Sequence, residues 1–268
     1  MTTLRIGQYE SLGTQPAYYH LLRELRQDHW QFVPAIPTDL DRALEHDEVD
    51  ISLVSPLLLC TAPDDYLVLP GVGYGARRHT RNMFLFSDML LDDIDEMTIS
   101  IPGEITSATI LQIVTGRYLQ FQNEFIVGWG SAEAFLLVGD PALRERQLGR
   151  YAYVYDIGDL WRHYTGKHMV YGLWALKRET FRRRREEVLD FHRSLRRGIA
   201  LMTGDWAVAA AQLRGYEWLR NPQTILQLWA DLDFELTEEH LVGLQRYFTD
   251  CVESGIIEEP PEIAYAEV

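Results

Sequence analysis

The chain has 268 residues, of which 47% are hydrophobic and 12% aromatic; this is enough for a packed core and excludes a disordered or low-complexity protein. Its 25 Lys and Arg against 40 Asp and Glu give a net charge of −15, which opposes binding to nucleic acid or to an anionic membrane. An anionic ligand would therefore have to be held by local geometry, such as helix N-termini and a few arginines.

The cysteines and the N-terminal segment give expectations about compartment. Cys60 and Cys251 are too few for a disulfide framework and match no zinc-binding spacing, so we interpret them as buried thiols. Residues 1–7 lack the apolar stretch of a signal peptide, and no window holds the roughly 20 apolar residues of a membrane helix. The sequence predicts a cytoplasmic location.

Strands and helices alternate along the first two thirds of the chain. Short apolar runs predict strands at 4–6, 31–33, 49–54, 66–69, 83–86, 98–101, 125–127, 134–138, 152–155 and 169–174. Helices are expected near Pro16, near Thr38 with Asp41 in an imperfect capping box, and after Thr106. From Glu179 to Glu253 the pattern is helical throughout.

This alternation predicts an α/β fold with mixed, mostly parallel sheets, helices on both faces and a helical C-terminal segment. A break near residues 92–95 and a return near 177–179 suit two lobes. We place lobe I at 1–94 plus 178–268 and lobe II at 95–177, with a ligand cleft between them.

Loops rich in small polar residues follow several predicted strands, where α/β sheets bind ligands. These loops contain Thr14, Ser55, Thr106 and Ser107, whose hydroxyl groups suit carboxylate binding next to helix N-termini. For each residue alone, capping of a helix is the competing interpretation. Their joint position at strand ends favours a site.

Other candidate motifs point away from nucleotides, metals and nucleic acid. The glycine-rich 71–75 stretch lacks the dinucleotide-binding spacing and is interpreted as a flexible cleft or crossing loop. His163 and His168 have no convincing third metal ligand. The arginine run 182–185 adjoins Glu186 and Glu187 on an amphipathic helix, which is typical of a solvated face.

Several segments in order resemble the chorismate dehydratase family of the futalosine route to menaquinone. Residues 135–143 (FLLVGDPAL) resemble its LLIGDxAL segment, and 155–161 (YDIGDLW) with 165–166 and 170–175 resemble its YDLGxxWxxxTGLPFVxAxWA segment. Ile6, Gly7, Leu12, Thr14 and Pro16 resemble its IGxVxYLNTxP opening, and residues 50–56 and 84–87 also fit. The matches span residues 4–176.

The resemblance implies a fold like type II periplasmic binding proteins and loss of water from chorismate to give 3-[(1-carboxyvinyl)oxy]benzoate, without metal or organic cofactor. The chain departs from the family pattern at Ser11 and Gly13, where the family has Tyr and Asn. It departs again at Asn82 and Glu104, where the family has Ser. These departures bear on the substrate more than on the fold.

The predicted site follows from both lines of reasoning. Glu104 and Asp156 are candidate catalytic acid–base groups, and the alternative for Asp156 is an N-cap of the following helix. The predicted substrate-binding residues are Ser11, Gly13, Thr14, Ser55, Asn82, Thr106 and Ser107.

Two other functions stay open: dihydroxynaphthoate synthase, the sister enzyme of the same fold, and a non-catalytic intracellular protein that binds a small carboxylate. The expected partner is a small anion resembling chorismate, with no nucleic acid and no membrane. A homodimer through the helical tail is left open.

Overall fold

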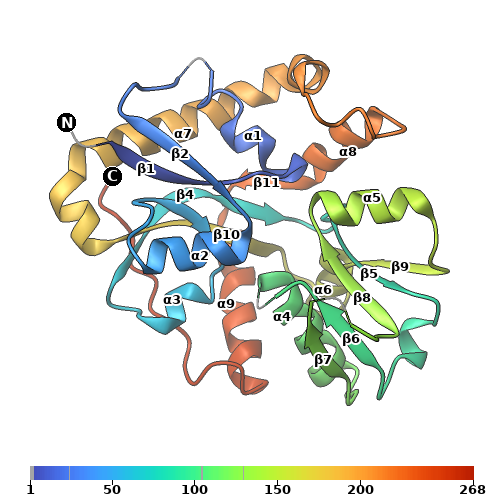
Figure 1. Cartoon of the computed structure of the whole chain (residues 1–268). Coiled ribbons are helices and arrows are strands. Elements are labelled where there is room, and N and C mark those ends of the chain that lie inside the picture. Colours follow the sequence, from blue (N-terminus) through green and yellow to red (C-terminus); the bar gives the residue numbers. More distant parts are fainter. Residues whose placement is uncertain (1–2, 24, 104, 129) are drawn as a thin grey trace.

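The computed structural model describes residues 3–23, 25–103, 105–128 and 130–268. In these ranges the strands form three sheets, arranged as two lobes (Figure 1). Sheet A pairs β1 (Leu4–Tyr9) with β2 (Trp30–Ala35). Sheet B has the order β11-β4-β10-β3, from Leu232–Glu235, Tyr66–Ala76, Met169–Lys177 and Ser52–Val54. Sheet C has the order β7-β6-β8-β5-β9, from Glu124–Val127, Thr98–Ile101, Ala134–Val138, Met83–Ser87 and Tyr153–Asp156.

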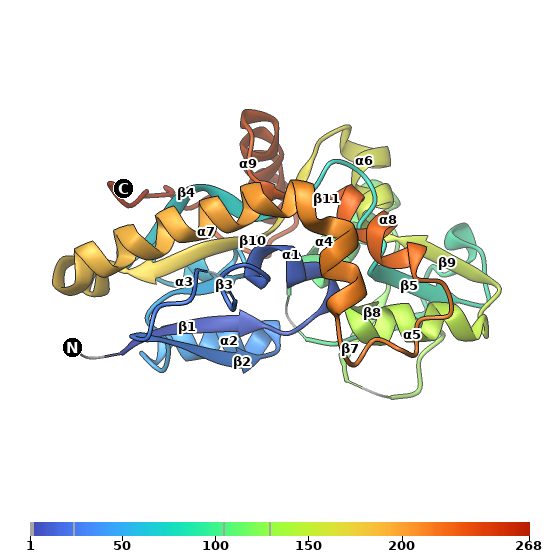
Figure 2. The ribbon, with the colours of Figure 1, turned by 90° about the horizontal axis from the view of Figure 1, so that it is seen from above.

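The helices lie around these sheets. Their bounds are α1 Gln15–Tyr18, α2 Pro37–Glu45, α3 Leu58–Thr61, α4 Thr106–Ile113, α5 Asp140–Leu148, α6 Ile157–Thr165, α7 Arg178–Gln212, α8 Gln223–Asp231 and α9 Glu238–Glu253. Short 3₁₀ turns lie at Leu12–Thr14 and Leu91–Asp93, and a π-helical turn at Val114–Tyr118 continues α4. Seen from above, the long helix α7 runs across sheets A and B (Figure 2). No helix in the described ranges is long and apolar enough to cross a membrane.

The predicted strands are all present, but their directions differ from the prediction. Among the described residues, five of the eight strand pairings are antiparallel, so the sheets are mixed but not mostly parallel. Alternation of strands and helices does not fix direction here, because the chain crosses between lobes after β4 and again before β10. The strand that follows each crossing pairs antiparallel with its new neighbour.

The sheets to which β5 and β10 belong place the lobe boundaries at other residues than predicted. β5 precedes residue 95 yet pairs with β8 and β9 in sheet C. β10 precedes residue 178 yet pairs with β4 and β3 in sheet B. The crossings therefore lie at 77–82 and 166–168, where charged and polar residues interrupt the apolar runs.

The glycine-rich 71–75 stretch is part of β4 and not a flexible loop. Its glycines allow close packing: a Cβ at Gly73 would lie 2.9 Å from the Gly172 carbonyl, and one at Gly75 would lie 2.9 Å from the Met169 carbonyl. Side-chain-free positions thus let β10 approach β4. The interpretation of this glycine-rich stretch as a loop is wrong. The glycines are required by the packing of β10, which lies about a hundred residues further along the chain.

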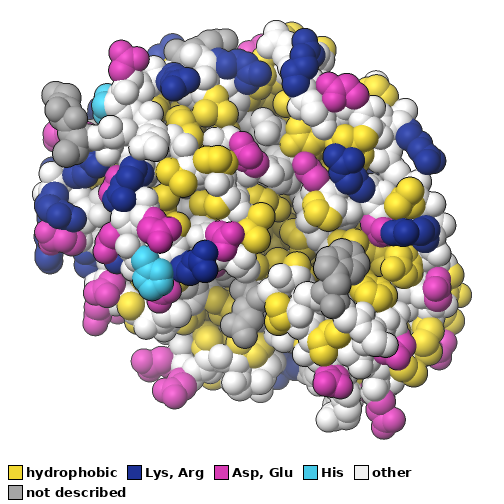
Figure 3. Space-filling model, in the orientation of Figure 1, with side chains coloured by type: hydrophobic (Ala, Val, Ile, Leu, Met, Phe, Trp, Pro, Cys, Tyr) yellow, Lys and Arg dark blue, Asp and Glu magenta, His cyan; other side chains and the backbone are white. Residues whose placement is uncertain are grey.

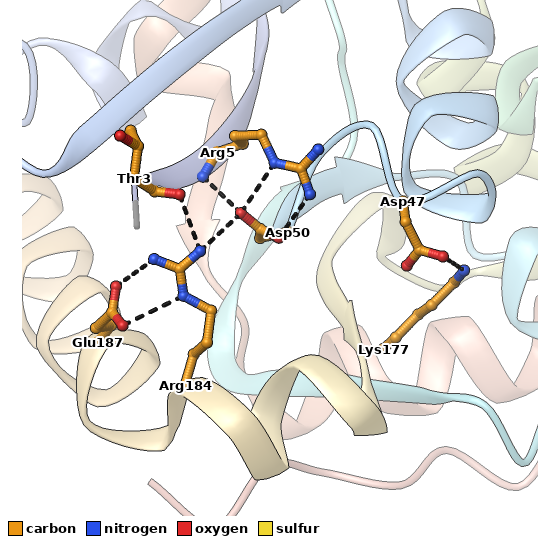
Figure 4. A network of polar contacts seen from close by, with 7 residues as sticks. All are labelled: Thr3, Arg5, Asp47, Asp50, Lys177, Arg184 and Glu187. Atoms are coloured by element: carbon orange, nitrogen blue, oxygen red, sulfur yellow. Dashed lines mark hydrogen bonds and ion pairs between the residues drawn. The ribbon is translucent and has the colours of Figure 1, made fainter. Parts of the chain in front are cut away.

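Between Arg178 and Glu253 the predicted helical segment is interrupted twice, at 213–222 between α7 and α8 and at β11, which pairs with β4 between α8 and α9. α7 is kinked at Arg184, which has φ of −130° and ψ of 31°. Figure 4 shows its guanidinium bonded to Asp50 at 3.2 Å and to Glu187. Asp50 also accepts hydrogen bonds from Arg5. Arg184 is therefore an internal anchor of α7 against β1, whereas Arg182 and Arg183 are solvated as predicted.

The two cysteines are free: Cys251 is buried, as expected, and Cys60 is half-buried. The expected apolar face of α7 is also found, with Val188, Phe191 and Leu195 fully buried.

Candidate functional site

A cavity of about 450 Å³, open solvent included, lies between the lobes. Its walls come from strand ends and from the first turns of two helices, as expected for α/β ligand sites. The lining residues are Tyr9, Pro37, Leu53, Val54, Ser55, Tyr74, Met83, Ile105, Thr106, Ser107, Val138, Tyr171 and Gly172. Hydrophobic side chains gather in the middle of this face, between α2 and α5 (Figure 3). None of the described residues lining the cavity is charged.

Three predicted hydroxyl residues meet in this cavity. Ser55, which follows β3, lies with its Oγ 3.0 Å from Oγ1 of Thr106 at the start of α4. Thr106 Oγ1 donates in turn to the Tyr171 carbonyl at 3.0 Å. No side chain of a described residue caps the first turn of α4, and this end of the helix, with Ser107, faces the cavity. Free N–H groups at a helix start attract anions.

Ser11 and Thr14 in the opening loop are buried, and their hydroxyls bond to backbone groups. Ser11 Oγ accepts from the Gly13 N–H at 3.3 Å, and Thr14 Oγ1 donates to the Tyr9 carbonyl at 2.6 Å. Neither Ser11 nor Thr14 lines the cavity. Ser11 caps the 3₁₀ turn, whereas the Thr14 hydroxyl caps no helix and bonds to carbonyls of the preceding turn. Asp140 holds the same loop by accepting from the Leu12 N–H at 2.9 Å.

Gly13 and Asn82 form a matched pair behind the cavity wall. A Cβ at Gly13 would lie 2.4 Å from Asn82 Nδ2 and 2.8 Å from Tyr74 Oη. Asn82 Nδ2 donates to Tyr74 Oη at 3.1 Å, and Tyr74 lines the cavity. The Asn82 amide therefore occupies the space that a side chain at position 13 would need.

Asp156 is the N-cap of α6, the alternative named for it. Its carboxylate accepts from the N–H groups of Gly158 and Asp159 at 2.9 and 3.3 Å. It also accepts from the Thr80 N–H, the Thr80 hydroxyl and the Arg81 N–H at 3.0, 3.1 and 2.7 Å. Five donors thus occupy this carboxylate, which ties the first crossing segment to α6 and does not line the cavity. The other catalytic candidate, Glu104, lies outside the described residues.

Three tyrosines in the cavity wall were missed from the sequence. Burial raises the pKa of Tyr9 to about 12 and also raises the pKa values of Tyr74 and Tyr171. All three phenols therefore stay protonated near neutral pH and act as hydrogen-bond donors. Aromatic residues in strands are usually core residues, so only Tyr9, in the loop after the first predicted strand at 4–6, carried a positional signal; the structure extends that strand to Tyr9.

Asp41 was expected in a capping box and has a different role. α2 begins at Pro37, and Asp41 Oδ1 accepts from the Ser55 N–H at 2.9 Å. Burial raises the pKa of Asp41 to about 7, with a smaller contribution from the charge of Glu45. The carboxyl therefore positions the loop that carries Ser55.

Among the described residues no group of three or more His, Cys, Asp or Glu is placed to hold a metal ion. The chemistry available in the cavity is hydrogen bonding by hydroxyl and N–H groups against apolar walls.

Comparison with known proteins was made on sequence and on structure. A protein family described as menaquinone biosynthesis matches residues 4–253. Protein AF1704 from Archaeoglobus fulgidus superposes with a TM-score of 0.77 at 14% identity, covering 95% of this chain and 98% of that one. The Candida albicans CA3427 gene product, described as having the generic periplasmic binding protein fold, gives 0.72 at 12% identity, with coverage of 97% and 92%. The aliphatic sulphonate binding protein SsuA from Escherichia coli gives 0.65 at 14% identity, with coverage of 100% and 94%. These likenesses confirm the predicted two-lobed periplasmic-binding-protein-like fold.

Proposed function

The chain belongs to the menaquinone-biosynthesis family, as its motifs predicted, and on this premise we propose that it is a chorismate dehydratase-like lyase. It removes water from chorismate to give 3-[(1-carboxyvinyl)oxy]benzoate in the futalosine route. The observation that carries the proposal is the junction of Ser55, Thr106 and Ser107 at the uncapped start of α4, inside an otherwise apolar cleft.

The junction suits a ring carboxylate. Helix N-termini attract anions through their N–H groups and partial positive charge, and serine and threonine hydroxyls add directional donors. Apolar walls such as Leu53, Met83 and Val138 lower the local dielectric, which strengthens each of these hydrogen bonds. A cyclic substrate with a carboxylate at one end and an apolar ring fits this distribution.

Besides binding the carboxylate, the proposed reaction requires few groups from the protein. Removal of the proton from the ring carbon that bears the enolpyruvyl ether builds negative charge, which delocalises onto the ring carboxylate. The N–H groups at the start of α4 and the Ser107 hydroxyl stabilise that growing charge. The base then passes the proton that it removed to the neighbouring ring hydroxyl, which leaves as water and gives the aromatic ring. Two groups are proposed as the base: Glu104 and the second carboxylate of the substrate. Asp156 is less suited to the role, because its carboxylate is already bonded to five donors.

The test is incubation of purified protein with chorismate, with substrate and products followed by chromatography and mass detection. We expect a product lighter by one water, formed by the unaltered chain and lost in the Thr106→Val/Ser107→Ala double variant. Thr115→Val is the matched control, because Thr115 is buried in the turn that continues α4 and bonds only to backbone carbonyls. Loss of activity in the control as well would mean that the double variant reports folding.

Unchanged chorismate, beyond its spontaneous decay, would overturn the lyase proposal. The departures at Ser11, Gly13, Asn82 and Glu104 favour one alternative in that event: an intracellular protein that binds a different small carboxylate. Thermal stabilisation by cyclic carboxylates would then identify its ligand. Turnover of cyclised futalosine derivatives would instead indicate the dihydroxynaphthoate synthase activity.

A further inference from the structure

Tyr171 lies in a β-bulge of β10. Val170 pairs with Gly75 and Gly172 pairs with Tyr74, so Tyr171 is an extra residue without a partner on β4. A bulge of this kind redirects a side chain and is common beside active sites. Here it places Tyr171 in the cavity wall next to Tyr74, with ring centroids 6.3 Å apart.

The Tyr171 hydroxyl is buried and has no hydrogen-bond partner among the described residues, although the residue lines the cavity. Only 6% of Tyr171 is exposed. A buried hydroxyl without a partner destabilises the free protein, and binding of an oxygen-bearing ligand would remove that cost. The neighbouring wall leaves room for the hydroxyl, since a Cβ at Gly158 would lie 3.1 Å from Tyr171 Oη.

The carbonyl and the hydroxyl of Tyr171 have different neighbours. Its carbonyl accepts from Thr106, at the proposed carboxylate end, whereas its hydroxyl lies at the far end of the side chain against the start of α6. Chorismate carries its ring carboxylate and its ring hydroxyl on opposite ring carbons. The proposed pose holds the carboxylate at α4, with the ring hydroxyl directed toward the phenol.

We propose that Tyr171 determines substrate specificity by donating a hydrogen bond from Oη to the ring hydroxyl that leaves as water. The proposal rests on the proposed lyase function. The phenol acts as a donor and keeps its proton; it orients the leaving hydroxyl. A substrate without that hydroxyl would leave the phenol unpaired and would lose the corresponding affinity.

The experiment compares Tyr171→Phe with the unaltered chain and with Tyr247→Phe. Tyr247 is a fully buried tyrosine on α9 that packs against Trp161 and does not line the cavity. For each protein we would measure the thermal midpoint without ligand, kcat/KM for chorismate, and thermal stabilisation by chorismate and by an analogue lacking the ring hydroxyl. We expect Tyr171→Phe to keep or raise the unliganded midpoint and to lose about tenfold in kcat/KM. Its preference for chorismate over the analogue should disappear, while Tyr247→Phe keeps that preference.

The proposal would be overturned if Tyr171→Phe kept the activity of the unaltered chain and its preference for chorismate over the analogue. It would also be overturned if a lowered thermal midpoint of Tyr171→Phe accounted for its loss of kcat/KM. If the unaltered chain binds chorismate without turning it over, the lyase function fails but the role of Tyr171 is still decided by the preference for the hydroxyl. Absence of stabilisation by either ligand in the unaltered chain would overturn both.

Discussion

Asp41→Asn is expected to stabilise this protein at alkaline pH and to leave it unchanged in acid. The pKa of Asp41 rises from 3.8 in the unfolded chain to about 7 in the fold, because burial penalises the charged carboxylate. Between these values the folded chain binds one proton more than the unfolded chain. The free energy of unfolding therefore falls as pH rises from about 4 to 7, by about 1.36 kcal/mol per pH unit for this group.

The full shift of about three units corresponds to about 4 kcal/mol. Relaxation of the loop around Ser55 recovers part of this once the carboxylate is charged, so we expect Asp41→Asn to gain about 2–4 kcal/mol at pH 8. Asparagine keeps an oxygen for the Ser55 N–H, which Asp41 binds at 2.9 Å. At pH 4, where the folded carboxyl is protonated, the gain should fall below about 0.5 kcal/mol.

Urea unfolding of both proteins at pH 4, 6 and 8 measures this difference directly. Asp39→Asn is the matched control on the same helix, because the Asp39 side chain is half-exposed and its partner among the described residues is the exposed Arg42. A gain at pH 8 in the control, or a gain for Asp41→Asn that does not change with pH, would refute the reasoning. A loss at pH 8 would mean that the charged carboxylate is required to hold the loop.

Three further predictions concern contacts that hold the fold outside the cavity lining. Gly13→Ala should cost about 1–3 kcal/mol of unfolding free energy, because the new Cβ would meet the amide of Asn82. Adding Asn82→Ser should restore part of that stability, and equal stability of the single and the double variant in urea would contradict this. Asp156→Ala should cost about 2–4 kcal/mol in the same assay through loss of the α6 cap and its bonds to the crossing segment, and a cost under about 0.5 kcal/mol would show that water replaces them. Gly243→Ala should lower the thermal midpoint strongly, since its Cβ would lie 1.9 Å from the His168 carbonyl, and an unchanged midpoint would show that α9 can shift off β10.

The positions of Ser55 and Thr106 along the chain predicted that these two residues lie together. Ser55 and Thr106 each follow a strand, and the carboxyl ends of strands meet at one edge of an α/β sheet. The same rule placed Thr14 in the site, but its hydroxyl bonds to the Tyr9 carbonyl 2.6 Å away, at the turn where β1 ends. A local turn and a ligand site use the same residue types, so sequence alone does not separate them.

The tyrosine wall depends on register, which sequence periodicity does not give. The residues around Tyr171 have the sequence pattern of a buried core strand. The bulge that places Tyr171 in the cavity wall arises from the pairing of β10 with β4. Asp41 was likewise assigned to a local cap, although its partner is Ser55, fourteen residues away. Contacts between distant segments decide both roles.

The neutral lining of the cleft fits the overall charge of the chain. At a net charge of −15 the surface field repels a dianionic substrate, and no described lining residue supplies a compensating positive charge. In the proposed reaction, binding rests on directional donors at the start of α4, at Ser107 and at the phenols, strengthened by apolar surroundings. Donors that strengthen as charge moves onto the carboxylate favour the transition state over the bound substrate.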